Sequence, residues 1–280
     1  MSYPALLALL STFCGVTSGT IQRAIMRKDG DIYPIMLFND ISACLLIGII
    51  FGLPDFSSFS FYTLLFLAMG GLFWGAAAWA NLKSSQCLDL NTAAIIGKAK
   101  FIVLILCGII IFNENLSISD FLGILLIIIA SLSSCDLTSN VIQKGSILKL
   151  LSVFAHTAAI ANEKMLASQV EAADISFMGF FFSALLFFTL NPKKAFHIPK
   201  EVTKSRGLII FVPFLKITSS LALITALKAG TLSGVIAICQ LDLLIVFVFG
   251  IIFLKENNNL PRKAFASVLC VFGGLIFHFA

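Results

Sequence analysis

The chain has 280 residues, of which 59% are hydrophobic and only 12% are charged. A soluble globular domain usually carries about 25% charged residues, so 19 basic and 14 acidic side chains are too few to cover a water-facing surface of this size. A mean hydropathy of +1.02 agrees, and together these values predict a polytopic membrane protein. The net charge of +5 requires no nucleic-acid partner, because basic loops of membrane proteins normally face the cytoplasm.

Ten stretches of the chain are long and apolar enough to be membrane-spanning helices, which need about 20 largely apolar residues. The first has no basic segment before it and is therefore unlike a signal peptide. Continuous apolar runs favour helices over a barrel, and the polar connectors between them are short. The predicted spans are residues 3–22, 33–53, 61–82, 91–112, 119–135, 146–163, 175–191, 207–227, 231–254 and 262–279.

The two halves of the chain resemble each other at an offset of 142 residues. Residues 108–115 (GIIIFNEN) align with residues 250–257 (GIIFLKEN), with five identities in eight positions. Five helices per unit is an odd number, so the second unit enters the membrane from the opposite side. We therefore predict an all-α membrane protein with ten transmembrane helices in two inverted five-helix repeats, residues 1–137 and 143–280. This architecture is typical of transporters with a site at the repeat interface.

The repeat unit resembles the drug/metabolite transporter superfamily, EamA type. The resemblance is carried by a Glu that ends the fourth helix of each half and by a Gly-containing fifth helix. In the first half these are residues 113–117 (NENLS) and Gly123, and in the second half residues 255–257 (KEN) and 273–274 (GG). The resemblance implies a secondary transporter that moves a small metabolite by alternating access across the plasma membrane, which is the inner membrane in a bacterium.

The chain departs from that family in the middle of the fourth helix of each half. Members often have a proline there, whereas this chain has Gly97 and Lys98 in one half and Cys239 and Gln240 in the other. The sequence therefore offers no proline to break either helix.

Five ionisable residues stand well inside the predicted spans: Asp40, Lys98, Lys100, Lys216 and Asp242. A charge in the membrane costs a few kcal/mol, so each is a functional candidate. Asp40 and Asp242 are the only carboxylates placed there, and with Lys100, which aligns with Asp242, they are predicted to form ion pairs or to couple protons. Lys98 and Lys216 are predicted to bind substrate. Static ion pairs that lock two helices are the competing interpretation.

Three uncharged residues complete the predicted substrate site: Trp74, Asn81 and Gln240. Gln240 aligns with Lys98 at the 142-residue offset and lies two positions before Asp242. Asn81 has helix–helix hydrogen bonding as its alternative role, and Trp74 has packing or lipid contact. Gly71 and Gly75, which flank Trp74, form a GxxxG motif that lets helix backbones approach closely.

Two acidic residues, Glu114 and Glu256, end the fourth helix of each half. A carboxylate at a helix C-terminus opposes the helix dipole, so helix propensity does not explain them. The family pattern suggests that each caps the loop that follows it.

The motifs exclude several classes of function. The sequence has no Walker A motif, no HExxH, no paired Cys and His, and no intramembrane protease motif, so we expect no enzyme activity, metal or cofactor. Three lysines against two aspartates inside the spans favour a zwitterionic or anionic solute, such as an amino acid or a related metabolite. The expected partners are this solute, membrane lipid and protons as the coupling ion. The alternative is a non-transporting membrane receptor or assembly scaffold.

The distribution of basic residues predicts the orientation. With ten helices, the loops after the odd-numbered spans share one side of the membrane, and 14 of the 19 basic residues fall there. The side with the termini holds only Lys164 and Lys228. Basic loops stay cytoplasmic, so both termini should lie outside, and a reporter that fluoresces only in the cytoplasm should stay dark when fused after Ala280. A bright fusion would contradict this orientation. The 14 residues are Arg23, Arg27, Lys28, Lys83, Lys144, Lys149, Lys193, Lys194, Lys200, Lys204, Arg206, Lys255, Arg262 and Lys263.

Overall fold

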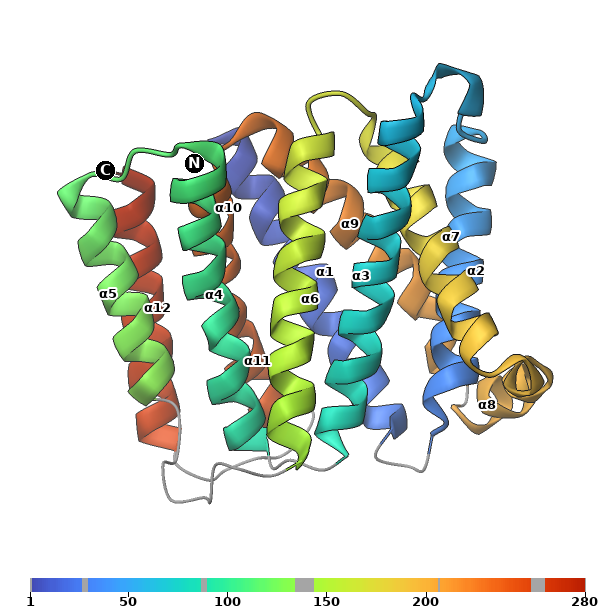
Figure 1. The fold of residues 1–280 in the computed structure, drawn as a ribbon. Helices are drawn as coiled ribbons and strands as arrows, with labels where there is room; N and C mark the ends of the chain where they lie inside the picture. Colours follow the sequence, from blue (N-terminus) through green and yellow to red (C-terminus); the bar gives the residue numbers. More distant parts are fainter. Residues whose placement is uncertain are drawn as a thin grey trace.

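The computed structural model describes residues 2–26, 30–86, 90–133, 144–205, 207–252 and 260–279, except for the side chains of a few residues in these ranges. Every regular element in them is helical. The long helices stand side by side, and both termini lie at the same end of the bundle (Figure 1). The α-helices are α1 (Tyr3–Met26), α2 (Ile32–Phe51), α3 (Phe61–Ser85), α4 (Leu90–Phe112), α5 (Ile118–Ser133), α6 (Lys144–Leu166), α7 (Ala172–Leu190), α8 (Ile198–Lys204), α9 (Phe211–Ala229), α10 (Leu232–Cys239), α11 (Asp242–Ile252) and α12 (Leu260–Phe279). Three 3-10 turns are η1 (Phe56–Ser58), η2 (Pro192–His197) and η3 (Leu208–Ile210).

Each predicted span falls on a described helix, and the span at 231–254 is occupied by two consecutive helices, α10 and α11. By length and composition, six of the described helical segments could cross a membrane. Large apolar side chains such as Ile49, Phe61 and Ile110 are more than 70% exposed on the outside of the bundle, as expected for a surface that faces lipid. The six segments are Tyr3–Met26, Ile32–Phe51, Phe61–Ser84, Ala172–Leu190, Leu208–Ala229 and Leu232–Phe249.

The most extensive helix contacts join the two halves of the chain. α3 packs along α6, α1 along α9, and α5 along α12, while α2 packs on α7 and α4 on α6 and α10. In every one of these pairs, one helix comes from the first half and the other from the second. The halves therefore share one core and are not two separately packed domains.

Small hydroxyl side chains form hydrogen bonds across two of these contacts. Between α1 and α9, Ser11 Oγ donates to the carbonyl oxygen of Ser219 and Ser219 Oγ donates to that of Ser11, both at 2.8 Å. Between α6 and α3, Ser152 Oγ donates to the carbonyl oxygen of Ala77 at 2.9 Å. Such bonds require close backbones, which small residues permit.

The GxxxG motif of α3 packs against α7, which confirms the close approach predicted from it. A Cβ atom on Gly71 would lie 2.8 Å from the carbonyl oxygen of Gly179 and 2.7 Å from Phe182 Cβ. A Cβ atom on Gly75 would lie 3.1 Å from Ser183 Oγ. Both glycines are thus needed for the distance between these two helices.

The helix at 231–254 is broken although it contains no proline. α10 ends at Cys239 and α11 begins at Asp242. At the break the chain forms 3-10 hydrogen bonds. The Gln240 amide donates to the Ala237 carbonyl oxygen at 3.2 Å, and the Leu241 amide donates to that of Ile238 at 3.0 Å. The corresponding helix of the first half, α4, is continuous from Leu90 to Phe112.

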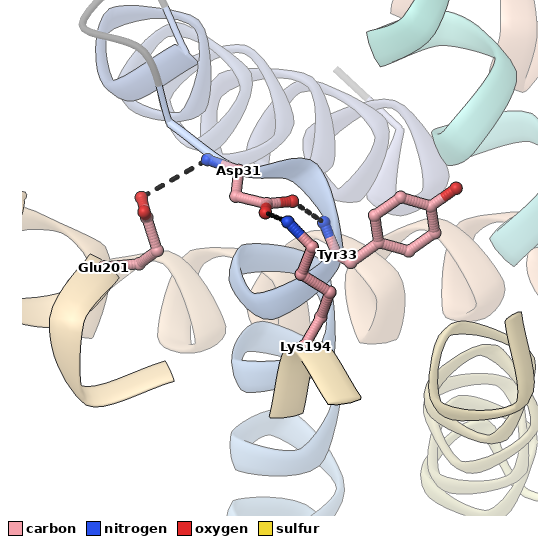
Figure 2. A network of polar contacts seen from close by, with 4 residues as sticks. All are labelled: Asp31, Tyr33, Lys194 and Glu201. Atoms are coloured by element: carbon pink, nitrogen blue, oxygen red, sulfur yellow. Dashed lines mark hydrogen bonds and ion pairs between the residues drawn. The ribbon is translucent and has the colours of Figure 1, made fainter. Parts of the chain in front are cut away.

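A polar network fastens η2 and α8 to the start of α2, at the end of the bundle opposite the termini (Figures 1 and 2). Asp31 caps α2, accepting a hydrogen bond from the Tyr33 amide at 3.2 Å, and its other carboxylate oxygen pairs with Lys194. The Asp31 amide donates to Glu201 Oε2 at 3.3 Å. The hydrogen bond to Asp31 raises the pKa of Lys194. The tyrosine hydroxyl in turn accepts from Trp79 Nε1 at 3.2 Å, which ties α3 to the same corner.

The contact between α3 and α7 generates a test of the fold. Gly71→Ala should lower the free energy of unfolding by about 1–3 kcal/mol, because the new methyl group meets backbone that cannot easily move. The matched control is Gly179→Ala on the facing helix, where a Cβ atom meets nothing within 4 Å. That variant should be neutral or slightly stabilising, since alanine favours helix. Melting temperatures of the purified proteins in detergent would measure both, and equal effects would contradict the packing.

Candidate functional site

A buried ion pair joins three helices, α2, α7 and α9. Lys216 Nζ on α9 lies 2.5 Å from Asp40 Oδ1 on α2. The other carboxylate oxygen of Asp40 accepts a hydrogen bond from Ser183 Oγ on α7 at 2.6 Å. Lys216 also lies over the Phe180 ring, 5.6 Å from its centroid. The Asp40 side chain is 1% exposed and that of Lys216 is 19% exposed.

This geometry tests two of the sequence predictions. Asp40 was predicted to form an ion pair or to couple protons, and in the structure it is paired with Lys216. Lys216 was expected to bind substrate, but its ammonium group is engaged by Asp40 and lies over an aromatic ring. Since both oxygens of the carboxylate have donors, the ion pair is the simplest role for both residues, and a substrate contact of Lys216 stays a prediction.

A second polar cluster lies between α3 and α6. Trp74 Nε1 donates a hydrogen bond to Glu163 Oε1 at 2.6 Å, and the Trp74 ring contacts the His156 ring with centroids 4.5 Å apart. His156 and Glu163 are seven residues apart on α6 and therefore share one face of that helix. Glu163 is 6% exposed, and its second oxygen, Oε2, is buried with no hydrogen-bond partner among the described residues.

The sequence analysis missed Glu163. The expectation that Asp40 and Asp242 are the only carboxylates well inside the helices is wrong, because Glu163 is also buried. It stands at the last position of the span predicted at 146–163, where a charged residue was assumed to reach water. α6 continues to Leu166, which places Glu163 inside the bundle. The seven-residue spacing from His156 was the available signal.

Asn81 and Trp74 both contact α6 and so serve helix packing. Lys149 Nζ donates a hydrogen bond to Asn81 Oδ1. Lys149 and Lys100 are also close enough to His156 to act on it electrostatically. These residues together form a polar layer between α3, α4 and α6, and a direct substrate contact by Trp74 or Asn81 stays a prediction.

The remaining predicted site residues gather around the break between α10 and α11. The Gln240 side chain is buried, with 4% of the residue exposed, and its Nε2 donates to the carbonyl oxygen of Ile236 at 3.4 Å. Asp242 lies in the first turn of α11, where the helix dipole favours a carboxylate. Lys100 and Asp242 both act electrostatically on the Cys239 thiol, and their mutual pairing stays a prediction. The side chain of Lys98 lies outside the described part of the structure.

Glu114 caps a helix of the other half of the chain, which corrects the expected role. Its Oε1 accepts a hydrogen bond from the Leu232 amide at 2.5 Å and its Oε2 accepts from the Ser233 amide at 3.0 Å. Both amides belong to the first turn of α10, where unpaired N–H groups and the positive end of the dipole favour a carboxylate. The expectation that Glu114 caps its own following loop is therefore wrong. Glu256 lies outside the described residues.

Lys164 makes the complementary contact at the end of α9. Its Nζ donates to the carbonyl oxygens of Leu227 at 2.6 Å and Gly230 at 2.5 Å. These carbonyls lie at the negative end of the α9 dipole, where a cation is favoured. Lys164 thus binds the end of α9 and Glu114 binds the start of α10, so the two residues together stabilise the connection between these helices.

These arrangements limit the chemistry that the described residues can perform. Within the described ranges, no three His, Cys, Asp or Glu side chains gather as metal ligands. The buried groups offer ion pairs, amides and one carboxylate oxygen with no donor, which are suited to binding protons or polar solutes.

Comparison with known proteins shows the fold alone. No family model matches the sequence, and no curated protein sequence matches it significantly. Twenty-seven chains of solved structures match. One of them, described only as the crystal structure of a protein, superposes with a TM-score of 0.75 at 12% identity and covers 98% of both chains. The similarity therefore extends over the whole helical bundle.

The buried ion pair predicts a specific pattern of stability. Lys216→Met should lower the free energy of unfolding by about 3 kcal/mol, because it leaves the Asp40 carboxylate buried without a countercharge. The double variant Asp40→Asn, Lys216→Met should recover most of this loss. Lys228→Met is the control on the same helix, since Lys228 pairs at 3.5 Å with Glu171, which is 79% exposed, and exposed pairs contribute at most about 1 kcal/mol. Thermal unfolding in detergent measures all three, and a double variant that is no more stable than Lys216→Met would contradict the pairing.

Proposed function

We propose that this chain is a secondary transporter of the drug/metabolite type, with ten helices that cross the membrane as two inverted five-helix repeats. It moves a small polar metabolite, zwitterionic or anionic, by alternating access. The observation that carries the proposal is the way the helices pair. When each helix is replaced by its equivalent at the 142-residue offset, the same pairs of packed helices are obtained.

The offset makes α1 equivalent to α6, α2 to α7, and α3 to α9. It makes α4 equivalent to α10 with α11, and α5 to α12. The pair of α3 and α6 therefore corresponds to the pair of α9 and α1, and both are among the most extensive contacts. The contacts of α2 with α7, α4 with α10 and α5 with α12 each join a helix to its own equivalent. This pattern supports a pseudo-twofold axis between inverted repeats.

The same correspondence extends to single residues. Ala77 and Ser219 are equivalent positions, and each accepts a hydrogen bond through its backbone from a serine on the partner helix. Trp74 and Lys216 are also equivalent. Each donates a hydrogen bond to a buried carboxylate, Glu163 in one case and Asp40 in the other.

Several features favour transport over a purely structural role. Inverted-repeat transporters place their sites at the repeat interface and use discontinuous helices there, and here polar groups gather between helices of different halves next to the break at Gln240. Four helices outside the six candidate spans, α4, α5, α6 and α12, run alongside the others (Figure 1). We include them as crossing helices. The polar side chains of α6 are compatible with this because α3 and α4 cover them.

The substrate class follows from charge. Among the described interior residues, Lys100, Lys149 and Lys216 stand against Asp40 and Asp242, which leaves one positive charge if Glu163 holds a proton. An interior of this charge attracts the carboxylate of an anion or of a zwitterion and repels a simple cation.

Uptake into proteoliposomes tests the proposal. The purified protein would first be screened by thermal shift against zwitterionic and anionic metabolites, and a stabilising compound would then be offered in radiolabelled form. We expect saturable uptake into vesicles with the protein, and an uptake rate at least tenfold lower for Gln240→Ala at an unchanged melting temperature. Gln169→Ala, an exposed glutamine, should transport normally. No uptake of any stabilising compound by the wild type would favour a receptor or scaffold.

A further inference from the structure

The carboxylate of Glu163 is satisfied on one side only. Oε1 accepts the hydrogen bond from Trp74 Nε1 at 2.6 Å, while Oε2 is buried with no partner among the described residues. The side chain is 6% exposed. This contrasts with Asp40, whose two oxygens receive a lysine ammonium and a serine hydroxyl.

Several cationic or histidine side chains stand on α6 and on the helices that pack on it. Those described are His156, Lys149 and Lys164 on α6 itself, Lys83 on α3, Lys100 on α4, and Lys216 and Lys228 on α9, while the side chains of Lys98 and Lys144 lie outside the described part.

Lys149 donates a hydrogen bond to Asn81, while Lys164 binds carbonyl oxygens at the end of α9. Lys216 and Lys228 pair with acids on other helices, and Lys83 is exposed near the end of α3. None of these described groups donates a hydrogen bond to the Glu163 carboxylate, whose described donor is Trp74.

A buried carboxylate without a countercharge is unstable in its ionised form. The cost of leaving such a charge unpaired away from water is several kcal/mol. A proton on Oε2 removes this cost and leaves Oε1 as an acceptor for Trp74. The ionised form becomes favourable when water or a cation reaches Oε2.

We infer that Glu163 is a proton-binding site of this protein and that Trp74 reports its occupancy. The proton sits on Oε2 in the described conformation and leaves when α3 and α6 open the site to water. Asp40, neutralised by Lys216, is a fixed ion pair and not the exchanging group. The role of this proton in driving transport rests on the proposed function, whereas its binding does not.

The two tryptophans of the chain, Trp74 and Trp79, allow a direct measurement. In a Trp79→Phe background, Trp74 is the single fluorophore. Excitation moves electron density from the pyrrole ring of indole towards the benzene ring, so a negative charge at Nε1 shifts emission to longer wavelength. We expect a reversible red shift of Trp74 emission as the pH of the detergent solution rises, and complete loss of this shift in Glu163→Gln.

Control variants separate Glu163 from its neighbours. Glu171→Gln, an exposed acid just beyond the end of α6, should keep the shift, and so should His156→Gln, although the His156 ring contacts Trp74. A shift that survives Glu163→Gln, or that disappears in His156→Gln alone, would overturn the inference. If Glu163→Gln does not fold, infrared spectra of the wild-type protein should show a protonated carboxyl band at neutral pH that vanishes at high pH, and its absence would also overturn the inference.

A transport measurement then addresses the coupling. In proteoliposomes, Glu163→Gln should lose accumulation driven by a pH gradient and keep substrate exchange. Loss of the fluorescence shift without any transport by the wild type would leave the proton site in place and contradict the proposed function. Accumulation that is unchanged in Glu163→Gln would show that another group couples the proton.

Discussion

The structure depends on one constraint: a charge inside a bundle that faces lipid must be neutralised within the bundle. The described residues meet it in three ways. Asp40 is neutralised by Lys216. Glu114 lies on the first amides of α10, where the helix dipole supplies partial positive charge. Lys164 lies on the last carbonyls of α9. Each of these contacts joins helices that are far apart in sequence, and the contacts of Asp40 and Glu114 also join the two halves of the chain.

Close backbone approach provides the second part of the arrangement. Gly71 brings α3 against α7, and Ser11 with Ser219 brings α1 against α9. Without a hydrophobic driving force between helices in lipid, such packing and interhelical hydrogen bonds carry much of the association. The polar groups of the interior are therefore part of what holds the helices together, and a functional role has to be compatible with that.

The local features of the fold could be predicted from the sequence, and the long-range contacts only in part. Apolar runs located the helices, and GxxxG predicted a close contact, because both properties depend on neighbouring residues. The ion pair of Asp40 was foreseen in kind, but its partner was not, since several lysines were available. The cap formed by Glu114 and the burial of Glu163 depend on helices of the other half. The break after Cys239 could not be predicted because no proline marks it. It lies at the buried Gln240, directly before the first turn of α11.

Two positions related by the 142-residue offset, Trp74 and Lys216, carry different chemistry, and in the proposed transporter this difference distinguishes the two halves. In the second half the donor to a buried acid is a cation, Lys216, which balances the charge of Asp40 permanently. In the first half the equivalent donor is the neutral indole of Trp74, which leaves the charge of Glu163 to be balanced by something that can leave. A proton is the smallest such group, and its release requires water. The charged donor Lys216 therefore links α9 to α2 through its ion pair with Asp40, while the neutral donor Trp74 leaves Glu163 as the proton-binding carboxyl group that we infer.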